Sequence, residues 1–288
     1  MPGGRNNRVL RLALADGSGL VLKSYFHHRE DSRDRLGAEW DFLTYAWELG
    51  VRCVPEPLAC DRRERLGLYG LVAGRRLAPA EVGEGHLRSA ADFVVALNPP
   101  GGSPAPLRPA SEACFSIGDH LGHVDRRVAR LQGLDRSAPH ADDAAAFVAD
   151  ILAPEWRRVR SRVGAACDAA GWAPDAAFAE RELVASPSDF GFHNALWSPD
   201  RGLSFLDFEY AGRDDPAKLV ADLFTCPEVP VSEEYFGAFA ADICARLGAP
   251  EAVQMRMHLL RDVHRIKWAC IALNDFLPGD ERRRRFAL

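Results

Sequence analysis

Two apolar stretches separated by a turn constrain the fold of this chain more than any other feature of the sequence. Residues 194–197 and 203–206 are mostly apolar, and the run Ser-Pro-Asp-Arg-Gly between them is typical of a turn. The pattern predicts a β-hairpin. Asn194 begins the first strand and Asp207 comes directly after the second, so the hairpin would bring these two polar residues close together. A further aspartate, Asp189, lies five residues before Asn194.

Asp189, Asn194 and Asp207 are residue types that phosphoryl transfer from ATP requires. That reaction needs a carboxylate to orient the attacking hydroxyl group and accept its proton, and oxygen ligands to hold magnesium against the phosphates. The alternative is that the first aspartate caps a turn and the asparagine forms one, with no catalytic role. Because an Asp-x-x-x-x-Asn pattern is common by chance, the catalytic interpretation depends on the joint spacing of all three residues.

The N-terminal part of the chain has the pattern of a small antiparallel sheet with one helix. Residues 7–26 indicate strand, turn and strand, residues 32–49 an amphipathic helix, and short strands are expected near residue 58 and over residues 66–72. Lys23 lies in the second strand, and Glu39 comes sixteen residues later in the helix. In protein kinases a helix glutamate pairs with a strand lysine in this way. The alternative is two unrelated surface charges.

The remainder of the chain is mainly helical. A run rich in proline and glycine at residues 98–109 must be a loop. The spacing of apolar residues predicts helices around residues 121–131 and 147–163, the second kinked near Pro154, and two more at residues 232–247 and 250–276. A strand-rich N-terminal part followed by a larger helical part predicts an α+β fold.

The segment Ser-Pro-Ser-Asp189-Phe-Gly-Phe-His-Asn194 and the later Asp207-Phe-Glu resemble motifs of the aminoglycoside phosphotransferase and choline kinase family, whose fold is related to that of protein kinases. In that family the catalytic loop typically reads H-G-D-x-x-x-x-N, and a metal motif of the D-[FW]-E type lies after it. The resemblance implies that Asp189 is the catalytic base, that Asn194 and Asp207 bind magnesium, and that ATP and Mg²⁺ are the cofactors.

The same resemblance assigns the rest of the nucleotide site and the domain organisation. It implies contacts to ATP from Lys23, Glu39, Gly3, Gly4, Leu71, Val72 and Ala73. The implied fold is a protein-kinase-like two-lobe α+β fold. Its nucleotide-binding lobe, a small antiparallel sheet with one helix, would span residues 1–73. The larger, mainly helical lobe, which would carry catalysis and substrate binding, would span residues 74–288.

The short segment after Asp207 constrains the kind of acceptor. A predicted helix begins about ten residues later, at Ala217, and the segment contains no A-P-E motif, so little room remains for a peptide platform. We therefore expect a small hydroxylated acceptor: an aminoglycoside-like antibiotic, an amino alcohol or a sugar. Pro187 stands where the family usually has a histidine, and this departure keeps open a catalytically inactive nucleotide-binding pseudokinase or scaffold protein. His193 either touches substrate or phosphate or packs the loop.

Other polar clusters have simpler interpretations. Asp119, His120 and His123 are expected to be ordinary residues of a helix surface, because no further metal ligand is evident nearby. The Asp-Asp-Pro run at residues 214–216 is expected to cap the helix after it. Neither group therefore adds a site to the predicted one.

Composition argues against several other classes of protein. The formal net charge of −5 argues against a nucleic-acid partner, which usually meets a basic surface. The seven cysteines are scattered and include no Cys-x-x-Cys, as expected for reduced thiols. No apolar stretch approaches the ~18 residues that a membrane-spanning helix needs. We therefore expect a cytoplasmic protein with no membrane or nucleic-acid partner; the sequence indicates no oligomeric state.

Overall fold

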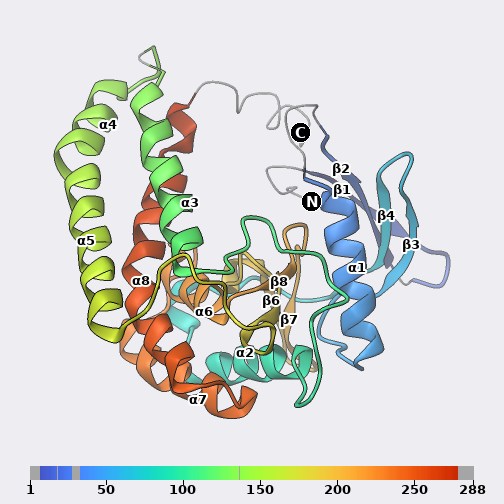
Figure 1. Cartoon of the computed structure of the whole chain (residues 1–288). Helices are drawn as coiled ribbons and strands as arrows, with labels where there is room; N and C mark the ends of the chain where they lie inside the picture. The colour runs from blue at the N-terminus through green and yellow to red at the C-terminus, as the bar shows by residue number, and fades with distance from the viewer. Residues whose placement is uncertain (1–6, 18, 28–32, 136, 278–288) are drawn as a thin grey trace.

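The computed structural model describes residues 7–17, 19–27, 33–135 and 137–277. These residues form an α+β fold of two lobes, a small antiparallel sheet with one helix and a larger, mostly helical part (Figure 1). The expected fold class is therefore confirmed. The expected boundary between residues 73 and 74 stays a prediction. None of the described helices is both long and apolar enough to cross a membrane.

The N-terminal sheet has four strands among the described residues, in the order β1-β2-β4-β3, and all neighbours are antiparallel. Their bounds are β1 (Asn7–Ala13), β2 (Gly19–Tyr25), β3 (Pro57–Asp61) and β4 (Leu66–Gly70). In the β1–β2 pair Val9 lies opposite Lys23, which fixes the lysine in the middle of β2. Because β2 lies between β1 and β4, it is an inner strand and a stable position for a functional side chain.

Helix α1 (Arg35–Glu48) lies along this sheet and contacts β3 and β4 (Figure 1). It begins at Asp34, whose carboxylate accepts a hydrogen bond from the Gly37 amide (3.0 Å). Phe42 and Leu43 are fully buried on the face that packs into the core. The observed elements of this lobe agree with the predicted ones to within a few residues.

The C-terminal lobe is built from seven helices and two short two-stranded sheets among the described residues. The helices are α2 (Glu84–Leu97), α3 (Ile117–Arg130), α4 (Ala141–Phe147), α5 (Ala153–Ala170), α6 (Pro216–Thr225), α7 (Phe236–Leu247) and α8 (Glu251–Ala272). The paired strands are β5 (Val184–Ser186) with β8 (Gly212–Asp214), and β6 (Ala195–Ser198) with β7 (Gly202–Phe205). Single 3₁₀ turns lie at Pro79–Glu81, Leu131–Gly133, Glu180–Glu182, Phe192–Asn194, Glu233–Tyr235 and Leu273–Phe276. Helix α8 contacts α3, α5, α6 and α7 and so organises the helical part (Figure 1).

Two features of this lobe differ from the sequence-based expectations. Helix α2 has no counterpart among the predicted elements, although its buried residues Leu87, Ala90, Phe93, Val94 and Leu97 follow helical spacing. Where a kink was expected near Pro154, the chain forms a π-helical segment, Val148–Leu152, directly before α5. Proline has no N–H to donate, and the wider turn accommodates the interrupted hydrogen-bond ladder.

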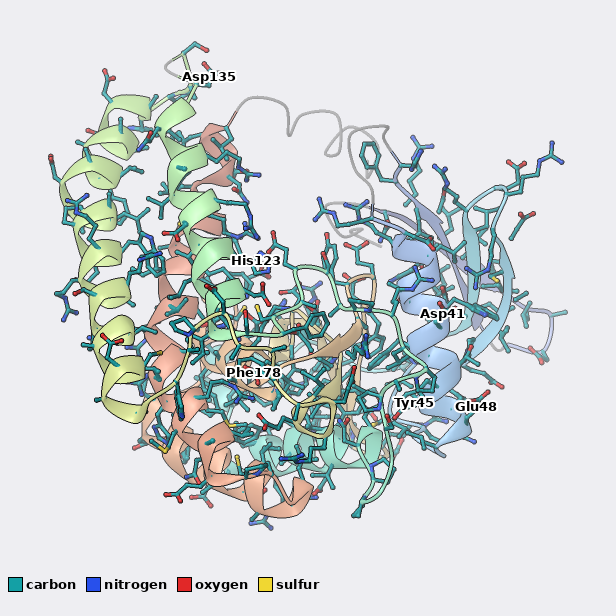
Figure 2. All side chains as sticks on the ribbon, in the orientation of Figure 1. Asp41, Tyr45, Glu48, His123, Asp135 and Phe178 are labelled. Atoms are coloured by element: carbon teal, nitrogen blue, oxygen red, sulfur yellow. The ribbon has the colours of Figure 1, made fainter. Side chains whose placement is uncertain are left out.

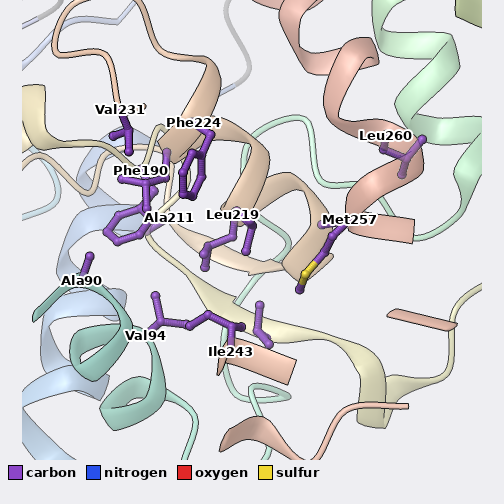
Figure 3. Packing of buried hydrophobic residues seen from close by; sticks show 14 of the residues in the cluster. Ala90, Val94, Phe190, Ala211, Leu219, Phe224, Val231, Ile243, Met257 and Leu260 are labelled. Carbon is purple, nitrogen blue, oxygen red and sulfur yellow. The ribbon is translucent and has the colours of Figure 1, made fainter. Parts of the chain in front are cut away.

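Aromatic side chains connect helix α2 with the segments that carry the predicted catalytic residues. The ring of Phe93 stacks on Phe205 at 4.4 Å between centroids and lies 6.0 Å from Phe190. Phe208 stacks on Phe42 of α1 at 4.8 Å. Phe190 reaches the core beside Ala211 and Phe224, near helices α2 and α6 (Figure 3). The backbone next to Asp189 and Asp207 is thus fixed by buried rings.

The predicted loop after α2 connects the two lobes. The Ala110 amide donates to the Arg213 carbonyl (3.0 Å), and the Arg213 amide donates to the Arg108 carbonyl (2.9 Å), so the loop runs beside β8. The guanidinium of Arg108 then reaches helix α1, where it donates to Asp34 (2.9 Å) and Asp41 (2.6 Å). The half-buried side chain of Asp41 extends from α1 (Figure 2). This loop therefore straps helix α1 to the C-terminal lobe.

We predict that Gly212→Ala destabilises the protein, because the loop leaves no room for a side chain on β8. A Cβ at this position would lie 2.4 Å from the Arg108 carbonyl oxygen and 2.5 Å from the Ala110 nitrogen. Forcing these backbone segments apart should cost roughly 1–3 kcal/mol in the free energy of unfolding, measured by urea denaturation. The matched control is Gly164→Ala in α5, where a Cβ meets nothing within 4 Å. That change should be neutral or stabilise by up to ~1 kcal/mol; equal effects of the two would contradict the prediction.

Candidate active site

The ammonium group of Lys23 connects two residues that are far apart in the sequence. Its Nζ lies 2.8 Å from Glu39 Oε1 and 3.0 Å from Asp207 Oδ1. The lysine side chain is 13% exposed and that of Glu39 only 1%. Burial disfavours the charge on Lys23, but the carboxylates of Asp207 and Glu39 outweigh it and raise the pKa of the lysine above its ordinary range. Lys23 and Glu39 thus pair as expected, and Asp207 contacts the same ammonium group.

Glu39 is fixed by more than the lysine. The Tyr25 hydroxyl donates to Glu39 Oε2 (2.6 Å) and also contacts the Tyr69 hydroxyl (2.8 Å). All three residues are buried, so each polar atom has a partner inside the sheet–helix interface. The glutamate therefore has a fixed orientation toward Lys23.

The three residues that begin at Asp207 each contact the N-terminal lobe. Asp207 binds Lys23, Phe208 stacks on α1, and buried Glu209 accepts a hydrogen bond from Asn7 Nδ2 (2.6 Å). Glu209 also lies 3.7 Å from Arg35 Nε at the start of α1. One short segment therefore links β1, β2 and α1. Asp207 itself has a φ of 65°, in the left-handed region that non-glycine residues seldom adopt.

The predicted hairpin is present and brings Asn194 beside Asp207. Strands β6 and β7 pair with Ala195 opposite Phe205, and the Leu206 amide donates to the Asn194 carbonyl (2.8 Å). The Asn194 side chain turns back to Asp189, donating to its carbonyl oxygen (3.1 Å) and approaching its carboxylate (3.4 Å). The amide nitrogen thus faces Asp189, which leaves the amide oxygen to serve as a ligand.

Asp189 sits in a strained and well-supported turn. Ser188 and Asp189 have φ values of 47° and 54°, a conformation that persists only where surrounding contacts enforce it. Ser188 provides one such contact, because the ammonium of buried Lys218 donates to its hydroxyl (3.1 Å). Lys218 is held in turn by Asp214 (2.5 Å). Pro187 is therefore followed by a serine that Lys218 supports, a contact that no sequence pattern had indicated.

The carboxylate of Asp189 is ionised and remains accessible. The side chain of Asp189 is 35% exposed, and that of Asp207 is 36% exposed. Burial opposes ionisation of Asp189, but His193, with its Nε2 at 3.5 Å from Oδ1, holds the pKa of the aspartate below its ordinary value. Burial likewise disfavours the charged imidazole, but Asp189 and Cys226 raise the pKa of His193 to about 10. His193 is buried rather than surface-exposed.

A buried network of charges includes His120, which was expected on a helix surface together with Asp119 and His123; that expectation was wrong for His120, while Asp119 and His123 are half-buried. His120 is 1% exposed, and its two ring nitrogens each lie 3.0 Å from a partner, His264 Nε2 and Asp215 Oδ2. Arg256 of α8 forms two hydrogen bonds of 2.9 Å with Asp215. Asp215 also accepts from the Ala217 amide (3.1 Å), which confirms the predicted cap of α6. His120 faces inward because α3 packs against α8 there.

Residues 71–73, the linker between the lobes, were also expected to contact the nucleotide, as were Gly3 and Gly4. The Leu71 amide donates to the Gly19 carbonyl (3.2 Å), so this N–H is already used by the sheet. In the part of the chain that the structure describes, the backbone groups of Val72 and Ala73 make no hydrogen bond. Their contact with adenine stays a prediction. The residues Gly3 and Gly4 lie outside the described residues.

Asn194 and Asp207 offer a suitable donor set for magnesium. They supply an amide oxygen and a carboxylate, which are ligand types that Mg²⁺ prefers, and this ion usually completes its shell with water and substrate phosphates. Across residues 7–277, apart from the short undescribed stretches, no group of three or more His, Cys, Asp or Glu residues is arranged to hold a metal by itself. The pair fits a metal that is shared with a nucleotide.

Comparison with known proteins identifies the fold. The sequence matches no protein-family profile and no curated protein. A macrolide 2′-phosphotransferase from Brachybacterium faecium is 18% identical, with a TM-score of 0.59 over 100% of this chain and 90% of the other. A choline/ethanolamine kinase family protein from Mesorhizobium loti is 18% identical (TM-score 0.58, 99% and 84%), and an aminoglycoside-3′-phosphotransferase of type VIII is 17% identical (TM-score 0.55, 92% and 91%). The predicted protein-kinase-like fold is thereby confirmed.

We predict that Asp215→Asn destabilises the protein by up to about 3–5 kcal/mol at neutral pH, because it removes the carboxylate that makes two hydrogen bonds with buried Arg256 and leaves that guanidinium with Glu182, at 3.1 Å, as its anionic partner. Burial opposes ionisation of Asp215, but His120 and Arg256 lower its pKa. This stabilisation is present above the unfolded pKa of about 3.9 and is lost as pH falls through the folded value.

Urea unfolding at pH 7 and at about pH 3 tests this, since the gap between wild type and variant should narrow in acid. The control is Asp92→Asn, which removes an exposed partner of Arg246 and should cost under ~1 kcal/mol. A gap that stays constant with pH would contradict the prediction.

Proposed function

We propose that this chain is an ATP-dependent phosphotransferase that transfers the γ-phosphate to a hydroxyl group of a small molecule. The observation that carries the proposal is the contact of Lys23 with both Glu39 and Asp207, at 2.8 and 3.0 Å. A chance match of motifs gives no reason for residues 184 positions apart to meet. The shared fold with macrolide, choline/ethanolamine and aminoglycoside enzymes supports the same conclusion.

Each residue of the site has a chemical task in this reaction. Asp189, ionised and about one-third exposed, orients the acceptor hydroxyl and accepts its proton. Lys23, kept charged by Glu39, binds phosphate oxygens of the nucleotide. Asn194 and Asp207 would hold Mg²⁺, which when bound supplies positive charge to the phosphates. Leu71, Val72 and Ala73 would contact adenine along the linker.

The acceptor is a small molecule rather than a peptide. Only eight residues separate Asp207 from Pro216, the first residue of α6, and three of these eight form strand β8. This leaves no long segment on which a peptide could lie. An aminoglycoside-like antibiotic, an amino alcohol or a sugar all meet the requirement for a reactive hydroxyl. A cytoplasmic location stays a prediction, as does the absence of membrane and nucleic-acid partners.

The alternative, an inactive nucleotide-binding pseudokinase or scaffold, has no observation in its favour. This alternative was raised because Pro187 stands where a histidine is usual. The turn at Ser188 and Asp189 is nevertheless supported, because Lys218 donates a hydrogen bond to Ser188. The lysine, glutamate, base and metal-ligand candidates all occupy one site. An inactive protein would have no need to keep Asp189 exposed in a strained conformation.

We predict that Asp189→Asn abolishes phosphate transfer while nucleotide affinity changes little, because the base acts mainly in the transition state. A loss of at least about 100-fold in kcat is expected, measured as ATP consumption with a panel of hydroxylated acceptors. The matched control is Asp200→Asn, an exposed residue in the turn of the same hairpin, which should leave kcat unchanged. Wild-type turnover in the Asp189 variant would refute its assignment as base.

We predict that tight ATP binding requires Mg²⁺ and that Asp207→Asn removes most of this requirement. Asparagine tolerates the φ of 65° at this position, so the variant should change charge more than backbone. Calorimetry with and without Mg²⁺ should show a metal-dependent gain in wild type that falls about tenfold or more in the variant, equivalent to ~1.4 kcal/mol. Equal affinities in both conditions for wild type would instead favour the inactive alternative.

A further inference from the structure

The carboxylate of Asp189 is contacted on both of its oxygens. Oδ2 faces the side-chain nitrogen of Asn194 at 3.4 Å, and Oδ1 faces Nε2 of His193 at 3.5 Å. The carboxylate therefore has little freedom to rotate about its own axis. A base that must accept a proton from one hydroxyl position benefits from such a restriction, because misplacement by about 1 Å can cost 100-fold in rate.

His193 is itself fixed on its remaining sides. Its Nδ1 lies 3.2 Å from the Cys226 sulfur, at the C-terminal cap of α6. The edge of its ring meets Trp268 of α8 at 6.3 Å and an angle of 84°. A Cβ at position 191 would lie 2.6 Å from Nδ1, so the ring occupies space that only Gly191 leaves open. The ring thus has a single available orientation.

This orientation determines which ring nitrogen faces the base. If the imidazole is neutral with its hydrogen on Nε2, then Nδ1 accepts from the Cys226 thiol. If it is protonated, Nδ1 donates to the sulfur and Nε2 still carries a hydrogen. The remaining tautomer would direct a lone pair at the Asp189 carboxylate and is disfavoured by repulsion. Nε2 therefore carries a hydrogen in both favoured states, and this nitrogen lies 3.5 Å from Asp189 Oδ1.

We propose that His193 is a positioning residue that fixes the Asp189 carboxylate for the acceptor hydroxyl, with Cys226 fixing His193 in turn. This inference rests on the proposed function. The histidine usually found before the catalytic aspartate is replaced by Pro187, and His193 supports the carboxylate from the other end of the same loop. If residue 193 served only to fill space, an apolar side chain would do so equally well and would avoid the cost of burying an imidazole. The buried imidazole therefore favours a role for its polar atoms.

The test compares two polar substitutions that differ in reach. In His193→Gln the side-chain nitrogen can occupy about the position of Nε2, whereas in His193→Asn it reaches only the position of Nδ1, away from Asp189. The readouts are ADP formation from Mg·ATP, with water and with choline, ethanolamine, an aminoglycoside and a macrolide as acceptors, together with KM for ATP and melting temperature.

We expect His193→Asn to lower kcat about 10- to 100-fold with KM for ATP within about threefold, and His193→Gln to restore kcat to within about threefold of wild type. In an Asp189→Asn background the His193→Asn change should have no further effect, because His193 acts only through the carboxylate. Melting temperatures of the two His193 variants should be similar, since both bury one amide in the same cavity.

Two results would overturn the inference while leaving the proposed function intact. One is a His193→Asn enzyme with wild-type kcat although Asp189→Asn is inactive. The other is an equal loss in the Gln and Asn variants, or a further loss in the Asp189→Asn background, which would indicate a general effect on packing. A wild-type protein with neither nucleotide binding nor ATP turnover would instead refute the proposed function, and the inference with it.

Discussion

The ion-pair contact of Lys23 with Glu39 and Asp207 is the interaction on which the arrangement of the site depends. It joins an inner strand of the sheet, helix α1 and the segment after the β6–β7 hairpin. Lys23 and Glu39 need each other, because an unpaired charge at their depth would cost several kcal/mol, whereas Asp207 is one-third exposed. The contacts of Phe208 with α1 and of Glu209 with Asn7 extend the same connection. The position of α1 relative to the catalytic loop is therefore fixed by three consecutive residues.

The strained turns at the site are maintained by packing on one side and by buried charges on the other. Phe190 and Phe205 anchor the backbone beside Asp189 and Asp207 against Phe93 of α2. Lys218 supports Ser188 from below. Left-handed conformations at non-glycine residues persist only where such contacts over-determine them. The result is a pair of carboxylates presented to solvent on a fixed backbone, an arrangement that suits the proposed reaction.

The buried charges beneath the catalytic loop also set the orientation of the helices. Asp215 binds His120 of α3 and Arg256 of α8, and Asp222 of α6 pairs with Lys267 of α8. Such pairs contribute little net stability compared with apolar residues of the same volume, but they tolerate only one arrangement of their partners. We infer that they define how α3, α6 and α8 meet. Trp268 lies next to Lys267 and contacts His193, which in turn contacts Asp189. The packing of α8 therefore also affects the surroundings of Asp189.

The sequence by itself determined most of the elements, although not helix α2, and the candidate catalytic residues that lie in or next to them. The hairpin, the caps and the strand–helix pattern result from local periodicity and turn chemistry, and the proximity of Asn194 and Asp207 is a property of that hairpin. Only the tertiary structure decided which side chains surround them. His193 contacts Asp189, Lys218 supports Ser188, and Arg108 straps α1, yet none of these pairings has a signal in the sequence. The physical reason is that a residue's local pattern specifies its own backbone, whereas a contact between distant segments depends on how whole helices and strands pack, and this is set by burial summed over the entire core.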